Sequence, residues 1–349
     1  MVAVAAAIVV SAGVVSVAPS SSIAVSNAAP QPVVSAKVDT TPIPLSGPGL
    51  SVPVRELPTA PANGEAADAP ARINPLAAEP DHGVGTTVTR PSPPIDPLVT
   101  RSRANTSVRT PPAQLVFDGT GNPEGCGICA PPDTTGDVGP NHYIQMVNST
   151  KVAIYNKSGV LLKPAFNLST LFKEGDCSTF DRGDPQVLYD PMAHRWLLSQ
   201  FTPRGSNKLC FAISQTADPL GAYYLYTFST PDFPDYFKVG VWPSGYYVGT
   251  NEDTYAAYAL DRTKMLAGLP ATAVRVSGET NLLMPADVDG SLPPADSGGL
   301  FYTFKSKNFQ AHHVNTDQLQ VTRLTPDFAT PANTKFETVA TIPITPFTY

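Results

Sequence analysis

Residues 183–201 read GDPQVLYDPMAHRWLLSQF and predict two short strands joined by a polar turn. An acidic residue and a Pro or Gly turn lead into a run rich in Tyr, Phe, Val or Ile. The same pattern starts three more times along the chain. The leading acids are 47, 51 and 52 residues apart, which is the period of a propeller blade built from four antiparallel strands. These acids are Asp137, Asp184, Asp235 and Asp287.

Strand signals dominate the later two thirds of the chain. Runs such as HYIQMV, KVAIYN, LCFAIS, AYYLYTF, GYYVGT and GLFYTF are separated by short turns, and QAHHVN (310–315) is assigned to a further strand. The one helical candidate is residues 260–268, LDRTKMLAG. The pattern predicts an all-β fold, a β-propeller of four-stranded antiparallel blades. About four blades fit, and because the chain stops after a strand-like segment, we expect an incomplete larger propeller.

The first third of the chain differs in composition from the rest. No Phe, Tyr or Trp occurs before Phe117, and residues 29–112 are rich in Pro, Ala and Ser without a sustained period. Such a segment buries too little apolar surface to offset its ordering entropy, so it predicts a disordered linker. We therefore expect one propeller domain at residues 113–349.

Residues 1–28 resemble a secretory signal. An apolar run is followed by small residues with a possible cleavage point after Ala28, although no Lys or Arg precedes the run. The alternative is an uncleaved N-terminal anchor, since about 17 apolar residues are at the lower limit for crossing a bilayer. Both interpretations predict an extracytoplasmic protein, secreted or at the cell surface, that contacts a membrane only through this segment.

The charge of the chain argues against nucleic acid as a partner. The formal net charge is −6, and it arises after residue 114, because seven basic and seven acidic side chains cancel before it. Binding to phosphate backbones needs a basic surface. The sequence also has no G-x-S-x-G, H-E-x-x-H, P-loop or G-x-G-x-x-G motif.

Four cysteines agree with export. They allow three disulfide pairings, and we expect two structural disulfides. A zinc site is the alternative, but Cys177 and Cys210 are 33 positions apart, whereas a zinc module usually brings a second pair at C-x-x-C spacing. Prolines directly after the Cys126–Cys129 step favour a loop there over a redox helix.

Several adjoining motifs resemble a widespread family of secreted bacterial proteins that are regarded as β-propellers and have no established activity. The motifs are PPDTTGDVGPNHYIQMVN, GDPQVLYDPMAHRWLLSQF, CFAISQTADPLGAYYLY, FKVGVWPSGYYV and MPADVDGSLPPADSG, and the match runs from about residue 112 to the end. The resemblance implies fold and compartment but no catalytic residues. It also implies that Cys177 pairs with Cys210, which leaves Cys126 with Cys129.

The four leading acids are the candidate ligand-binding residues. Asp137, Asp184, Asp235 and Asp287 could meet at one mouth of the propeller channel and bind a central cation or a cationic ligand there. The alternative is that each carboxylate caps a turn or accepts backbone hydrogen bonds within its own blade.

Calcium is the one cofactor that the sequence suggests. Asp287 and Asp289 resemble the start of an EF-hand loop, but Gly298 stands where the bidentate Glu should be. A looser calcium loop would use Asp287, Asp289 and Asp296, and otherwise this stretch is a solvated turn. The adjacent His312 and His313 would point to opposite faces of a strand and so would not share a metal ion.

Two functions follow from these features. The first is an exported binding module for an extracellular glycan or protein, favoured by aromatic residues that could face a ligand, although we expect most of them to pack within the sheets: Trp242, Tyr246, Tyr247, Tyr223 and Tyr224. The second is an extracellular polysaccharide hydrolase or lyase, with Asp184 and Asp235 at the propeller mouth as acid and base. The sequence does not decide between a binding protein and an enzyme.

Overall fold

The computed structural model describes residues 36–39, 41–60, 115–121, 132–148, 150–181, 183–279, 281–309, 312 and 314–345. All of them belong to one compact unit, Val34–Tyr349. The signal-like segment, most of the expected linker, Cys126, Cys129 and His313 lie outside the described residues.

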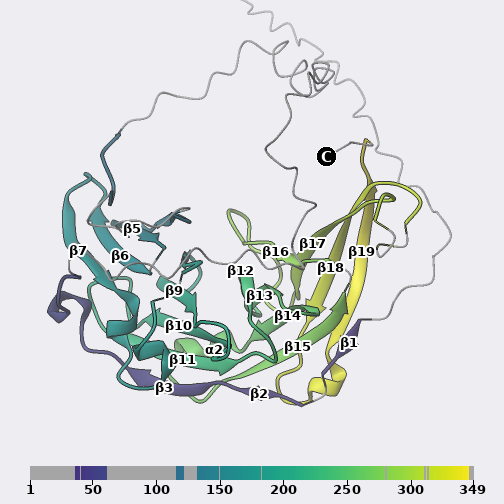
Figure 1. The fold of residues 1–349 in the computed structure, drawn as a ribbon, viewed down its shortest axis with the longest axis horizontal. Helices are drawn as coiled ribbons and strands as arrows, with labels where there is room; N and C mark the ends of the chain where they lie inside the picture. Colours follow the sequence, from purple (N-terminus) through teal and green to yellow (C-terminus); the bar gives the residue numbers. More distant parts are fainter. Residues whose placement is uncertain are drawn as a thin grey trace, which may run out of the picture. The chain divides into compact units, whose positions relative to one another are not determined.

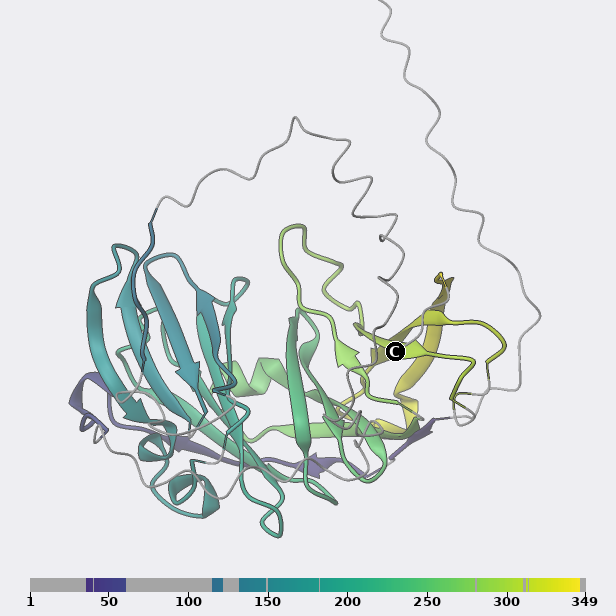
Figure 2. The same ribbon diagram turned by 45° about the horizontal axis from the view of Figure 1, so that its top comes forward.

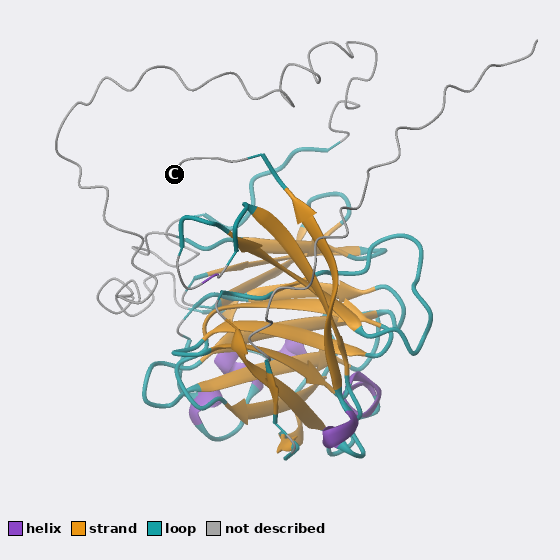
Figure 3. Ribbon diagram, turned by 90° about the vertical axis from the view of Figure 1, so that its right-hand side faces the viewer, coloured by secondary structure: helices purple, strands orange, loops and turns teal. Residues whose placement is uncertain are grey.

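The described residues form four antiparallel sheets, and each contains four strands that follow one another along the chain (Figure 1). Figure 3 shows how strands predominate over helices. The first sheet contains β4 (Thr135–Val138), β5 (His142–Val147), β6 (Lys151–Asn156) and β7 (Leu161–Asn167); the second β8 (Gln186–Asp190), β9 (Arg195–Phe201), β10 (Lys208–Ser214) and β11 (Tyr223–Ser229); the third β12 (Asp235–Trp242), β13 (Gly245–Asn251), β14 (Tyr255–Leu260) and β15 (Thr272–Glu279); the fourth β16 (Met284–Pro285), β17 (Gly299–Lys305), β18 (Gln318–Thr325) and β19 (Lys335–Pro343).

The sheets meet through their first strands. Strand β4 contacts β8, β8 contacts β12, and β12 contacts β16. Because each sheet places its first strand beside the first strand of the next, these strands are the inner ones and the four sheets are successive blades. The predicted all-β fold with four-stranded antiparallel propeller blades is therefore confirmed.

Apolar side chains fill the spaces between neighbouring blades. Strands with period-2 alternation send one face toward each neighbour, so each interface receives side chains from two sheets. Trp196 in β9 is 1% exposed and packs with Ile144 and Val152 of the preceding blade, as expected for a core residue. Further fully buried side chains of the interfaces include Tyr226, Phe237, Tyr246, Tyr258 and Phe301.

One disulfide is present among the described residues. Cys177, in the 3-10 turn η3 (Asp176–Ser178), is bonded to Cys210 of β10 with Cα atoms 5.9 Å apart. This confirms the pairing that the resemblance implied. The bond attaches the connection between the first and second blades to the second sheet.

The N-terminal region contradicts part of the expected linker. Residues 36–39 and 41–60, here called the strap, form β1 (Lys37–Val38), β2 (Ile43–Pro44), β3 (Ser46–Leu50) and the 3-10 turn η1 (Val54–Glu56). Strands β1 and β2 pair with β15, and β3 pairs with β11. The strap thus adds an outer strand to the third and second blades, as Figures 1 and 2 show in purple.

The strap also reaches the first blade. The Ala60 amide donates to the Ala165 carbonyl at 2.8 Å, the Lys163 ammonium donates to the Leu57 carbonyl, and Val54 is fully buried. Composition failed to predict this segment because strand addition at a sheet edge uses backbone hydrogen bonds, which need few large side chains. The segment's only buried apolar side chains are Leu45, Val54 and Leu57.

Two smaller expectations have opposite outcomes. The predicted helix is present as α2 (Arg262–Leu266), and Asp261 caps it by accepting the Lys264 amide at 3.1 Å. The predicted strand at 310–315 is wrong for the described residues of that stretch, since His312, Val314 and Asn315 lie in no strand and β18 begins only at Gln318. The His312 ring is 9% exposed and its Nδ1 accepts the Ser306 amide at 2.8 Å, which holds the turn.

Within the described residues no helix has the length and apolar character needed to span a bilayer.

Candidate functional site

Three aspartates lie where three successive inner strands begin. Asp133 precedes β4 by two residues, Asp184 precedes β8 by two, and Asp235 is the first residue of β12. They are separated by 51 residues each, one per blade. Because each blade is an antiparallel meander, the loop between its second and third strands lies at this same end, which we call the entry end.

All three aspartates have raised pKa values, and at Asp184 the charges of the other two contribute. Burial raises the pKa of Asp184 from 3.8 to about 6, and repulsion by Asp133 and Asp235 adds to this, while attraction by Lys238 opposes it. Burial likewise raises the pKa of Asp133 and of Asp235, with Lys238 again opposing. Burial lowers the pKa of Lys238 although all three carboxylates favour its charge. We call Asp133, Asp184, Asp235 and Lys238 the aspartate cluster.

Backbone strain coincides with the cluster. Asp133, Asp184 and Tyr236 have φ angles of 41°, 42° and 48°, in the left-handed region that non-glycine residues rarely occupy. Gly183 has φ of 111°, and a Cβ atom there would lie 2.0 Å from the Asn148 side-chain oxygen. Strain of this kind persists only where surrounding contacts hold it, and it concentrates at functional sites.

Hydrogen bonds fix the carboxylates from several loops. The Asn148 Nδ2 atom, in the loop after β5, donates to Asp133 Oδ2 at 2.7 Å. The Tyr236 amide donates to Asp235 Oδ1 at 2.9 Å. The ring of Tyr236 is 48% exposed, and the Lys238 ammonium lies 4.0 Å from its centroid. The entry end therefore combines carboxylates, an amide, an ammonium and an exposed aromatic ring.

The structure separates the four aspartates that the sequence grouped together. Asp184 and Asp235 belong to the aspartate cluster, whereas Asp137 and Asp287 accept backbone hydrogen bonds further along the inner strands. Asp137 Oδ2 accepts the Tyr189 amide of β8, and Asp287 Oδ1 accepts the Val241 amide of β12, both at 2.6 Å. Each carboxylate thus ties two neighbouring blades together, and each also accepts the amide of the residue that follows it, Val138 or Val288, which is the backbone bonding within one blade that the alternative predicted.

Asp133 is the cluster residue that sequence reasoning missed. The motif comparison aligned Asp137 with Asp184, because both follow a glycine and precede an apolar run. The register of the sheets instead places Asp137 at the level of Tyr189, whose amide it accepts. The constant spacing of 51 residues from Asp133 through Asp184 to Asp235 was the available signal.

The calcium prediction receives no support from the described residues, which contain no group of three or more His, Cys, Asp or Glu side chains placed to hold a metal ion. Asp287 is engaged with the Val241 amide, and removal of its carboxyl from water raises its pKa, with repulsion by Asp289 adding to this. Asp289 and Asp296 are exposed on the loop that follows β16.

Most of the aromatic inventory belongs to the core. Trp242, Tyr246, Tyr247 and Tyr223 are buried, and Tyr224 is half-buried. Their side chains therefore stabilise the blades and do not form a ligand surface. The exposed ring near the carboxylates is Tyr236, which the sequence did not single out.

No protein-family model matches this chain, and no curated protein matches it. Membership of the family of secreted propellers therefore stays a prediction. Among solved structures, a GH43 β-1,3-galactosidase is similar at 14% identity, with a TM-score of 0.30, over 58% of this chain and 44% of that chain. The chain spans less than half of that protein, and the similarity is too low to carry an argument about function.

Proposed function

We propose that this chain is an exported β-propeller that binds an extracellular glycan at the aspartate cluster. The observation that carries the proposal is the unfavourable state of the cluster itself. Burial raises the pKa of three carboxylates near one lysine, the charges of Asp133 and Asp235 add to the rise at Asp184, and Asp133 and Asp184 have left-handed backbone. An arrangement that costs stability and is nevertheless built into three blades is typical of a binding or catalytic site.

The chemistry of the entry end suits a carbohydrate. Sugar hydroxyls donate to carboxylates and accept from amide and ammonium groups, which Asp133, Asn148 and Lys238 supply. The exposed ring of Tyr236 offers an apolar surface next to these polar groups. Small-molecule sites usually combine a small number of polar groups in fixed positions with an apolar or aromatic surface.

Retention on a panel of immobilised neutral, acidic and amino-sugar polysaccharides tests the proposal. We expect the protein to be retained by at least one glycan, and Asp184→Asn and Asp235→Asn to weaken this binding about 10- to 100-fold, since a hydrogen bond to a charged group contributes about 1.5–3 kcal/mol. Asp296→Asn, an exposed aspartate far along the chain, is the control. Absence of retention across the panel, retention of a protein ligand alone, or equal binding by Asp184→Asn would refute the glycan site.

Hydrolysis of a polysaccharide is the second candidate, and one observation favours it. A carboxyl whose pKa is raised to about 6 is suited to donate a proton near neutral pH, and Asp184 has two other carboxyls as electrostatic neighbours. If the site is hydrolytic, Asp184→Asn should abolish the release of reducing ends while Asp296→Asn retains it. If the wild-type protein binds a glycan without releasing reducing ends, the hydrolytic role is refuted and only the binding role is supported.

Export is part of the proposal. The Cys177–Cys210 disulfide fits an oxidising, extracytoplasmic compartment, where such bonds persist. Fractionation of the native host should place the chain outside the cytoplasm, and recovery of the reduced protein from the cytoplasm would contradict this.

A further inference from the structure

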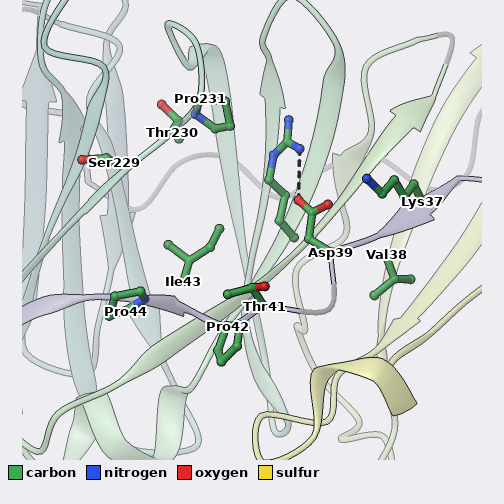
Figure 4. A pocket seen from close by; sticks show the side chains of 11 residues that line it. Lys37, Val38, Asp39, Thr41, Pro42, Ile43, Pro44, Ser229, Thr230 and Pro231 are labelled. Atoms are coloured by element: carbon green, nitrogen blue, oxygen red, sulfur yellow. Dashed lines mark hydrogen bonds and ion pairs between the residues drawn. The ribbon is translucent and has the colours of Figure 1, made fainter.

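A buried ion-pair network connects the strap to the entry end of the third blade. Asp39 of the strap lies 3.2 Å from Arg275 of β15, a pair drawn as a dashed line in Figure 4. Arg275 Nη2 in turn donates to Glu252 Oε2 at 2.9 Å. The Glu252 side chain is fully buried and that of Arg275 is 10% exposed, so the Glu252 carboxylate depends on its protein partners.

Glu252 and Arg275 each have more than one partner in this network, and Asp39 makes two bonds to Arg275. Glu252 Oε1 accepts the hydroxyls of Thr250 at 2.7 Å and Tyr258 at 2.5 Å, and Arg275 Nε donates to Tyr258 Oη at 3.0 Å. On the strap side, the Asp39 amide also donates to the Arg275 carbonyl at 2.9 Å. Strap and loop are therefore both fastened to the same arginine.

Glu252 opens the loop that follows β13, next to the aspartate cluster. The residue before it, Asn251, is the register partner of Asp235 in the pairing of β12 with β13. The ladder is irregular between Asp235 and Lys238, so the position of Asp235 depends on this last pair more than in a regular sheet. A shift of Glu252 would move Asn251 and, through it, Asp235.

We propose that Asp39, Arg275 and Glu252 are positioning residues through which the strap holds Asp235 in place within the aspartate cluster. The strap is then part of the machinery of the site and not only a cover for the outer edges of the blades. The proposal rests on the proposed function for its biological meaning, but the coupling itself is a property of the ligand-free protein.

Asp39→Asn is the variant that tests the coupling. A cavity of about 610 Å³, lined by the strap, Arg275 and residues 229–231, lies beside the pair (Figure 4), and the Asp39 side chain is 31% exposed. The variant therefore weakens the link to Arg275 without leaving a buried charge unpaired, because Glu252 still pairs with Arg275. Asp218→Asn is the matched control, because it removes an ion pair of 2.7 Å between the second blade and Arg55 of the strap that does not involve Glu252.

Two measurements on the ligand-free protein read out the coupling. In Asp39→Asn we expect faster amide hydrogen exchange at residues 251–254, and a pKa of Asp235, followed by NMR of 13C-labelled aspartate carboxyls, that moves down toward its ordinary value as water reaches the loosened end of β12. Asp218→Asn should change neither. Unchanged exchange at 251–254 or an unchanged Asp235 pKa in Asp39→Asn overturns the inference.

A glycan retained by the wild-type protein supplies a third measurement. Its affinity should fall roughly 2- to 30-fold in Asp39→Asn and stay constant in Asp218→Asn, the range found for residues that couple to a site without touching its ligand. Equal affinity in Asp39→Asn also overturns the inference. If the wild-type protein binds no glycan, the proposed function fails, while the exchange and titration results still support or refute the coupling.

Discussion

Replacement of Asp184 by Asn should make the protein more stable at neutral pH. The Asp184 carboxyl has a pKa of about 6 in the folded protein against an ordinary value of 3.8, mainly because it is buried. A difference of about 2 units, at 1.36 kcal/mol per unit, corresponds to about 3 kcal/mol. Asn keeps the shape of the side chain and tolerates the left-handed backbone at this position, so the substitution removes chiefly the charge.

The sign of the pH dependence follows from the raised pKa. Below about pH 3.8 the carboxyl is neutral in both the folded and the unfolded chain, so it does not disfavour folding. Above about pH 6 the folded protein holds a charge that the unfolded chain solvates better, and the full penalty applies. The penalty therefore develops between about pH 4 and 6 and is constant at higher pH.

Urea denaturation between pH 4 and 8 measures this effect. At pH 8 we expect Asp184→Asn to raise the free energy of unfolding by up to about 3 kcal/mol, equivalent to about 6–12 °C in Tm for a folded region of this size. Burial also raises the pKa of Asp181 to about 6. Because Asp181 is still present in the variant, we expect the variant to keep part of the wild-type pH dependence. Asp296→Asn is the control. A variant no more stable than wild type at pH 8, with an unchanged slope between pH 4 and 6, would refute the electrostatic account of the cluster.

Three further substitutions test the fold and its connections, each by urea denaturation. Val54→Ala should lower the free energy of unfolding by about 2 kcal/mol, because Val54 of the strap is fully buried in the core it shares with the blades, whereas Val116→Ala, at an 84% exposed position, should change little; equal effects would mean that the strap is not packed. Removing the disulfide in the double variant Cys177→Ala, Cys210→Ala should destabilise by about 3–4 kcal/mol, as expected for a loop of 33 residues, and an unchanged midpoint would contradict this. Asp190→Asn should cost about 3–5 kcal/mol, because the buried Arg262, 2.6 Å away, loses its ionic partner; a loss below 1 kcal/mol would show that water solvates Arg262.

The four blade sheets were predictable because their strands are short runs of large apolar and aromatic residues separated by turns. Strands such as β5, β9 and β13 bury large apolar residues between blades, and these residues can be recognised in the sequence. The strap was not predictable in this way, since β2 and β3 contribute Pro and Gly residues and are held mainly by backbone hydrogen bonds to β15 and β11. Backbone pairing at an edge leaves little trace in composition.

The candidate site was predictable in part. Asp184 and Asp235 were identified from their place before apolar runs, and the structure brings both to the entry end. Asp133 was missed and Asp137 was misplaced, because a shift of four residues along the chain moves a carboxylate from the end of an inner strand to its middle. Only the register of the sheet distinguishes these positions. The network from Asp39 through Arg275 to Glu252 joins residues more than 200 positions apart, which no local motif reveals.

The strap has a consequence for the order in which the protein folds. Lys37 pairs with Ser277, 240 residues later, so the strap must wait until the third blade exists before it can dock. Closing so large a loop is entropically costly and slow. Until then the outer edges of β11 and β15 expose unpaired backbone groups, which invite association with other chains. The first of the described segments in the chain therefore cannot dock until the third blade, more than 200 residues later, has formed, and in that interval the open edges of β11 and β15 favour aggregation.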